Sequence, residues 1–154
     1  YCQIELRMVA HLSGDDALLE AFSRHDDDIF VSMAARLFRL PRVRVDEQAR
    51  NRAKKVCYAV LYGVGPRGAM EDLGCGYDEA KRILAEWFET YPGVKAYFQL
   101  VKANCRKEGF VRSLAGRQRH LEKIRSTETR ERNEAERKAV NSVCQGSAAD
   151  VIKR

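Results

Sequence analysis

The sequence predicts a mainly α-helical fold with very little strand. Apolar residues recur at three- and four-residue spacing over most of the 154 residues, and this spacing places them on one face of a helix. Capping residues, glycines and prolines divide the pattern into segments of ordinary helix length. A hydrophobic fraction of 45% is enough for a core, and 32% charged residues supply a polar surface. We therefore expect a helical body with one small hairpin.

The first third of the chain predicts two capped helices after an ambiguous opening. Residues 3–9 alternate too briefly to separate a strand end from the start of a helix. Asp15 can cap one short helix, and Asp28 can cap a second that ends before Pro41. The acidic run 26–28 is explained better by a helix start than by a metal site, because carboxylates favour the positive end of the helix dipole.

The middle of the chain predicts three further helices, over residues 46–62, 78–91 and 92–108. Asp46 can cap the first of them and Gly63 follows its end. Pro92 suits the first position of the third helix, and Gly109 stops it. Trp87 falls on the apolar face of the second and is expected in the core.

The last third predicts a hairpin and a long charged helix. Residues 110–114 and 118–121 flank Ala115-Gly116, which is a turn signal. A helix then follows over about 128–145. We expect Gly146 to interrupt it, and Ser147 to Asp150 to begin another helix with spacing similar to a capping box.

One face of the predicted helix 46–62 carries two cations followed by two aromatic rings. Arg50, Lys54, Tyr58 and Tyr62 step by four residues, so each advances only about 40° around the axis. This stripe suits a nucleoside triphosphate, with Arg and Lys on the phosphates and a Tyr ring against base and sugar. The alternative is a solvated basic face with tyrosines at its edge.

A second stripe lies on the late helix, where Arg137, Asn141 and Gln145 again step by four and point one way. All three can donate hydrogen bonds. The minor groove offers acceptors at every base pair, so such donors can grip a duplex without reading its sequence. Taken alone, this helix is explained more simply by an ordinary polar face.

Charge and cysteine usage narrow the class of protein. A net charge of +6 suits a polyanionic partner such as nucleic acid, although a basic globular surface explains it as well. The five cysteines are widely spread and form no C-x-x-C pair, so we expect no zinc site and no disulfide framework, and an intracellular protein. No run approaches the roughly 18 apolar residues of a membrane span, so no membrane partner is expected.

Four segments, in order along the chain, resemble the family A (polymerase I-like) DNA polymerases. They are residues 1–15, similar to motif A; residues 50–63, similar to motif B, the nucleotide-binding helix; residues 109–119, similar to the hairpin that follows it; and residues 135–150, similar to the template–primer helix. Tyr58-Ala59 and Gly146-Ser147 resemble the eukaryotic theta and nu polymerases more than the bacterial enzymes.

The resemblance implies a fold of helical fingers plus part of an α+β palm. Residues 1–8 would be a truncated palm strand segment, residues 9–127 the fingers with the nucleotide-binding helix 46–62, and residues 128–154 the palm's template–primer helix and the start of the next helix. Phe30 stands where bacterial members place a phosphate-contacting His, so that contact would be lost.

The resemblance also implies roles for individual residues. Arg50 and Lys54 would bind the triphosphate, and Lys54 would act catalytically by protonating the leaving pyrophosphate, because a Lys can have its pKa lowered whereas Arg stays charged. Glu5 would exclude a ribose 2′-hydroxyl with a hydrogen bond to Tyr62. The remaining contacts would come from Tyr58 and Gln3 to the nucleotide and from Tyr62, Arg117, Arg119, Arg137, Asn141 and Gln145 to primer–template DNA.

The implied parent enzyme adds deoxynucleoside monophosphates to a primer in DNA repair or replication. Such transfer uses two Mg²⁺ ions about 3.5–4 Å apart between aspartates. Both family aspartates would lie outside this chain, leaving only the backbone carbonyl of Tyr1 as a metal contact, and the piece alone should be inactive. A resemblance to theta or nu would imply the nucleus. The alternatives are a DNA-binding relative that has lost the aspartates, and a helical scaffold with a basic surface.

Overall fold

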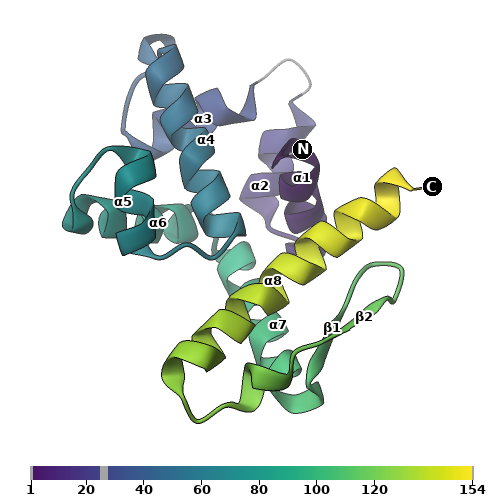
Figure 1. Ribbon diagram of the computed structural model, residues 1–154. Helices are drawn as coiled ribbons and strands as arrows, with labels where there is room; N and C mark the ends of the chain where they lie inside the picture. The colour runs from purple at the N-terminus through teal and green to yellow at the C-terminus, as the bar shows by residue number, and fades with distance from the viewer. Residues whose placement is uncertain (1, 25–27, 154) are drawn as a thin grey trace.

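Helices make up most of the structure, a computed structural model that describes residues 2–24 and 28–153 (Figure 1). The helices are α1 (Cys2–Ser13), α2 (Asp16–Ser23), α3 (Ile29–Leu37), α4 (Glu47–Leu61), α5 (Pro66–Leu73), α6 (Tyr77–Thr90), α7 (Pro92–Glu108) and α8 (Thr129–Ile152). Short 3-10 turns, η1 (Arg42–Arg44) and η2 (Glu122–Arg125), precede α4 and α8. The strands β1 (Phe110–Arg112) and β2 (Gln118–His120) form an antiparallel hairpin that pairs Val111 with Arg119.

Side-chain caps begin the helices where the sequence places them. Asp15 accepts a hydrogen bond from the Leu18 amide at 2.9 Å, Asp28 from the Phe30 amide at 2.9 Å, and Asp46 from the Ala49 amide at 2.7 Å. All three predicted caps are confirmed, as are Pro92 at the start of α7 and the left-handed Gly109 at its end. The Asp46 cap fixes where α4, which carries the first stripe, begins.

Two apolar cores hold the helices together. The larger lies among α1–α8 and includes Trp87, which is fully buried, as predicted. The smaller lies where α7, the hairpin and η2 meet α8, around Cys105, Ile124 and Ala139. In Figure 1 the long α8 starts at the bottom of the view, runs past the lower end of α4 and ends near α1, with the hairpin tip beside its C-terminal half. α8 therefore brings the second stripe, which it carries, next to the end of the first stripe on α4.

Two sequence predictions about secondary structure are wrong. Residues 1–8 were expected as a strand segment, but residues 2–13 form one helix, because Leu6, Val9 and Ala10 share a buried face at helical spacing. Gly146 was expected to interrupt the last helix, but α8 continues through it. A side chain there would be crowded, since a Cβ on Gly146 would lie 3.2 Å from Ser113 Cβ. The glycine serves close packing of the hairpin rather than a helix end.

A further helix, α5, was not predicted. Its signals are present in the sequence, since Pro66 occupies the first turn and Gly74 ends the helix in the left-handed conformation, with φ of 62°. At eight residues, α5 is too short for a clear apolar repeat.

Candidate functional site

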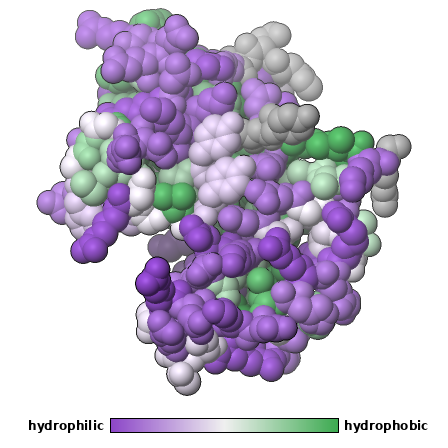
Figure 2. Space-filling view, viewed as in Figure 1, coloured by the Kyte–Doolittle hydropathy of each residue, from purple (hydrophilic) through white to green (hydrophobic). Residues whose placement is uncertain are grey.

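The stripe on α4 faces outward because the opposite side of the helix is buried. Ala53, Val56, Cys57 and Val60 are all buried in the larger core. The rings of Tyr58 and Tyr62 are stacked, with centroids 6.1 Å apart and planes within 10°. Figure 2 shows a mainly hydrophilic surface along α4 and α8 on this side of the molecule. The stripe is thus a preformed surface with cations at one end and rings at the other.

An ion pair and an aromatic ring hold the cations of the stripe. Arg50 Nε lies 2.6 Å from Asp28 Oδ2, and about a third of each side chain is exposed. The buried Phe30 ring lies under both Arg50 and Lys54, at 5.8 and 5.9 Å from their charged groups. Burial raises the pKa of Asp28, but hydrogen bonds from Arg50 and the Phe30 amide outweigh it and hold the pKa below its ordinary value.

Glu5 and Tyr62 meet across α1 and α4, although 57 residues separate them in the chain. The Tyr62 hydroxyl donates to Glu5 Oε2 at 3.2 Å, and both residues are half-buried. The contact implied by the resemblance is therefore present. It places a carboxylate beside the stacked rings, at the end of the stripe away from the cations.

The second stripe meets the first at the end of α4. Asn141 Nδ2 lies 3.5 Å from the carbonyl oxygen of Tyr62, and Asn141 Oδ1 is buried without a partner among the described residues. Gly63 has φ of 63°, and a Cβ on it would lie 2.7 Å from Arg137 Cγ. Arg137 and Gln145 are exposed, whereas Asn141 is half-buried. Asn141 thus faces α4 as well as the open surface.

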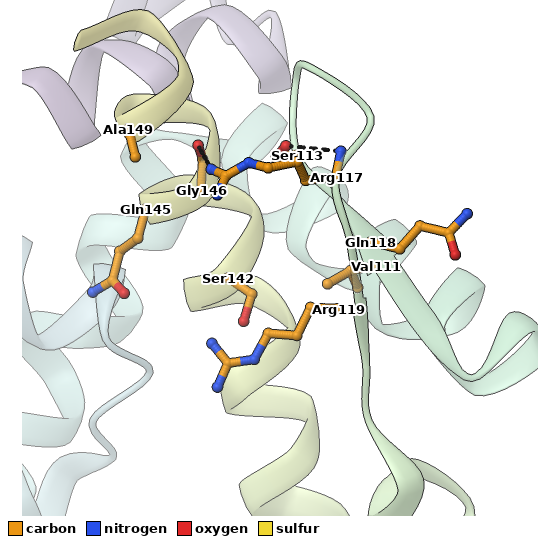
Figure 3. A pocket seen from close by; sticks show the side chains of 9 residues that line it. All are labelled: Val111, Ser113, Arg117, Gln118, Arg119, Ser142, Gln145, Gly146 and Ala149. Atoms are coloured by element: carbon orange, nitrogen blue, oxygen red, sulfur yellow. Dashed lines mark hydrogen bonds between the residues drawn. The ribbon is translucent and has the colours of Figure 1, made fainter. Parts of the chain in front are cut away.

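A groove of about 390 Å³ lies between the hairpin and α8 (Figure 3). Its lining includes Arg117, Arg119 and Gln145, which were all predicted to contact DNA. Arg119 reaches toward Ser142 on α8, whereas Arg117 is bound within the protein, donating to Asp150 at 2.8 Å and to the Gly146 carbonyl at 3.0 Å. The structure therefore gives Arg117 an internal partner that the sequence did not indicate.

Comparison with known proteins assigns the family, since residues 1–154 match the family described as DNA polymerase family A. The chain belongs to DNA polymerase family A. It is 41% identical to DNA polymerase theta of Drosophila melanogaster over 99% of its length and 7% of that protein. It is also 41% identical to DNA polymerase I of Pseudomonas aeruginosa over its whole length and 17% of that protein. The chain therefore spans less than a fifth of these relatives.

A solved structure of the same family has the same fold. The POL domain of Pol1 from M. smegmatis, in complex with DNA primer-template and dNTP, superposes with a TM-score of 0.90 at 38% identity, over 99% of this chain and 27% of that one. Theta and polymerase I are equally similar to this chain, so the predicted likeness to theta and nu stays a prediction.

A metal centre of the polymerase family is not formed by the described residues alone. Within 2–24 and 28–153, no three His, Cys, Asp or Glu side chains gather into a group that could hold a metal ion. Tyr1, predicted to offer its carbonyl, lies outside the described residues, as do Asp26 and Asp27 of the acidic run. Gln3 is exposed in the first turn of α1. None of the described helices is long and apolar enough to cross a membrane.

Two site features escaped the sequence analysis. Asp28 was recognised only as a helix cap, yet its second carboxylate oxygen binds Arg50 of the stripe. Asp150 was placed only in a capping-box-like pattern, yet it binds the hairpin. The only sequence signal was that a carboxylate capping a helix uses one oxygen and leaves the other open. This signal does not identify the cation that binds the second oxygen.

Proposed function

We propose that this chain is the nucleotide-binding region, with part of the primer–template-binding surface, of a DNA-directed DNA polymerase. The whole polymerase adds deoxynucleoside monophosphates to a primer 3′ end opposite a template, in DNA repair or replication. Residues 9–127 form the fingers and residues 128–154 part of the palm. The structure of the M. smegmatis relative with primer-template and dNTP supports this assignment.

The observation that carries the proposal is the hydrogen bond between Glu5 and Tyr62 beside the stacked rings. A protein that only binds DNA has no use for a carboxylate held against the place where a nucleotide sugar would lie. Glu5 excludes the ribose 2′-hydroxyl, and Tyr58 packs against the incoming sugar and base. Arg50 and Lys54 bind the triphosphate, and Lys54 donates a proton to the leaving pyrophosphate.

The duplex lies along α8, where Arg137, Asn141 and Gln145 face its minor groove and Arg119 reaches from the hairpin. Two Mg²⁺ ions supply the charge neutralisation that phosphoryl transfer needs. Their aspartate ligands would come from parts of the polymerase outside this chain. The enzyme acts inside the cell, and in the nucleus if it is of the theta or nu type.

The test is primer extension by the polymerase that contains this chain, with matched deoxy- and ribonucleotides. We expect Glu5→Ala to raise kcat/KM for the ribonucleotide about tenfold, equivalent to ~1.4 kcal/mol, while Glu89→Ala, an exposed glutamate on α6, changes nothing. If Glu5→Ala and the unmodified enzyme prefer the deoxynucleotide over the ribonucleotide by the same factor, Glu5 does not exclude the ribose 2′-hydroxyl. A protein that binds primer–template but does not extend it would be the non-catalytic relative.

A further inference from the structure

Backbone amides at the tip of the hairpin are bound by side chains of α8. The Leu114 amide donates to Ser147 Oγ at 2.9 Å, and the Ala115 amide donates to Asp150 Oδ2 at 3.0 Å. Ser147 is fully buried, and only 8% of the Asp150 side chain is exposed. Three residues separate the two acceptors, so they stand on the same side of the helix. Together they hold the turn at a fixed place along α8.

The same carboxylate also binds Arg117, at the other end of the turn. Arg117 Nε donates to Asp150 Oδ1 at 2.8 Å, and a terminal nitrogen of Arg117 donates to the Gly146 carbonyl at 3.0 Å (Figure 3). Hydrogen bonds from Ser113 and the Ala115 amide, with Arg117, hold the pKa of Asp150 below its ordinary value. Asp150 is therefore ionised near neutral pH and satisfied on both oxygens.

Strand pairing sets the direction of the Arg119 side chain. Arg119 lies directly opposite Val111, and residues directly opposite in an antiparallel pair point to the same face. Val111 is buried against α8, so Arg119 is directed toward α8 as well. Figure 3 shows this arrangement, with Arg119 reaching toward Ser142 and Gln118 pointing away. Arg119 has no hydrogen-bond or ion-pair partner among the described residues.

We infer that Asp150 is a positioning residue, which fixes the hairpin on α8 so that Arg119 stands at the hairpin groove and binds a phosphate of the primer–template. The inference rests on the proposed function, since it assigns the phosphodiester backbone as the ligand of this groove. Gly146 is part of the same arrangement, because the hairpin approaches it closely enough to leave little room for a side chain. Asp150 itself does not touch the DNA.

A positioning role for Asp150 and simple electrostatics predict opposite changes in DNA affinity when its carboxylate is removed. Removing a carboxylate near DNA increases the positive charge of the surface, and on charge alone this strengthens binding. If Asp150 acts by placing Arg119, its removal releases the hairpin and weakens binding. Glu134 is a matched control, because it also forms an ion pair on α8, with Lys138 at 2.7 Å, but makes none of the hydrogen bonds to the hairpin.

The experiment measures primer–template affinity of the polymerase that contains this chain by fluorescence anisotropy over a series of salt concentrations. We expect Asp150→Ala to weaken binding about fivefold and to lower the salt slope by about 0.9, the value of one phosphate contact. Arg119→Gln should do the same, and the double variant should be no weaker than Arg119→Gln alone. Glu134→Ala should bind primer–template as tightly as the unmodified protein or more tightly, and its KM for the deoxynucleotide should stay unchanged.

Asp150→Asn guards against loss of folding, since it keeps an oxygen for the Ala115 amide and loses the charge and the acceptor that face Arg117. We expect a melting temperature close to that of the unmodified protein and an intermediate loss of affinity. Tighter binding by Asp150→Ala, or a further loss when it is added to Arg119→Gln, would overturn the inference. Failure of the unmodified protein to bind primer–template would instead overturn the proposed function.

Discussion

The ion pair between Arg50 and Asp28 predicts that Asp28→Asn improves nucleotide binding. Arg50 is assigned to the triphosphate, yet in the structure its Nε lies 2.6 Å from Asp28 Oδ2. The carboxylate therefore occupies one donor of Arg50 and places a negative charge beside the position assigned to the triphosphate, and both effects oppose triphosphate binding. Asn keeps the helix cap of α3, because Asn and Asp cap equally well, and it removes the charge and the oxygen that bind Arg50.

The size of the effect follows from the exposure of the pair. About a third of each side chain is open to solvent, so the pair contributes about 0.5–1 kcal/mol rather than the several kcal/mol of a buried one. This corresponds to a fall in KM of about two- to fivefold. The pKa of Asp28 is lowered in the folded protein, so the pair is complete above the ordinary Asp pKa and is lost only as pH falls through the lowered value. At neutral pH the full effect is expected.

The assay is steady-state insertion of one deoxynucleotide on a primer–template by the polymerase that contains this chain. Glu79→Gln is the matched control, because it releases Arg52 of the same helix from a pair of equal length, 2.6 Å, and Arg52 lies outside the stripe. We expect KM to fall for Asp28→Asn and to stay unchanged for Glu79→Gln. Added to Arg50→Ala, the Asp28 change should have no effect. An unchanged or higher KM for Asp28→Asn would refute the reasoning.

Further expectations concern stability and thiol reactivity. Asp15→Ala removes the buried acceptor for amides of both α2 and α7, and we expect urea denaturation to show a loss of about 2–4 kcal/mol; less than 1 kcal/mol would contradict its double role. Gly63→Ala forces a side chain into the left-handed conformation and against Arg137 Cγ, so the same measurement should show a loss of about 1–3 kcal/mol. Burial raises the pKa of Cys144 to about 12, so at pH 8 a thiol reagent should label the half-buried Cys75 well before Cys144, as mass spectrometry would show.

Local sequence signals predicted much of the fold because they act within one turn. The caps at Asp15, Asp28 and Asp46 were recognisable since a carboxylate before an apolar repeat binds amides two or three residues away. The predicted helix break at Gly146 was wrong because it depended on a contact distant in the sequence. A glycine's effect on a helix depends on what lies against it, and here that is Ser113, which is 33 residues away in the chain.

Spacing along one helix predicted each stripe, but it could not predict what neighbouring elements bring to it. The side chains of Arg50, Lys54, Tyr58 and Tyr62 share a face because the helix repeat requires it. Asp28 reaches that face from another helix, and no periodicity encodes the contact. The hydrogen bond from Tyr62 to Glu5 was expected only from the family resemblance, because nothing local relates residues 57 positions apart.

The two stripes meet at Tyr62, the last residue of the first stripe. The Tyr62 hydroxyl binds Glu5, while its carbonyl faces Asn141 on α8. The next residue, Gly63, lets Arg137 of the same helix approach closely. A duplex that draws Asn141 and Arg137 toward its minor groove therefore acts on the backbone that orients the Tyr62 ring. In the proposed enzyme, contacts of Asn141 and Arg137 with the primer–template would therefore also act on the backbone that carries Tyr62.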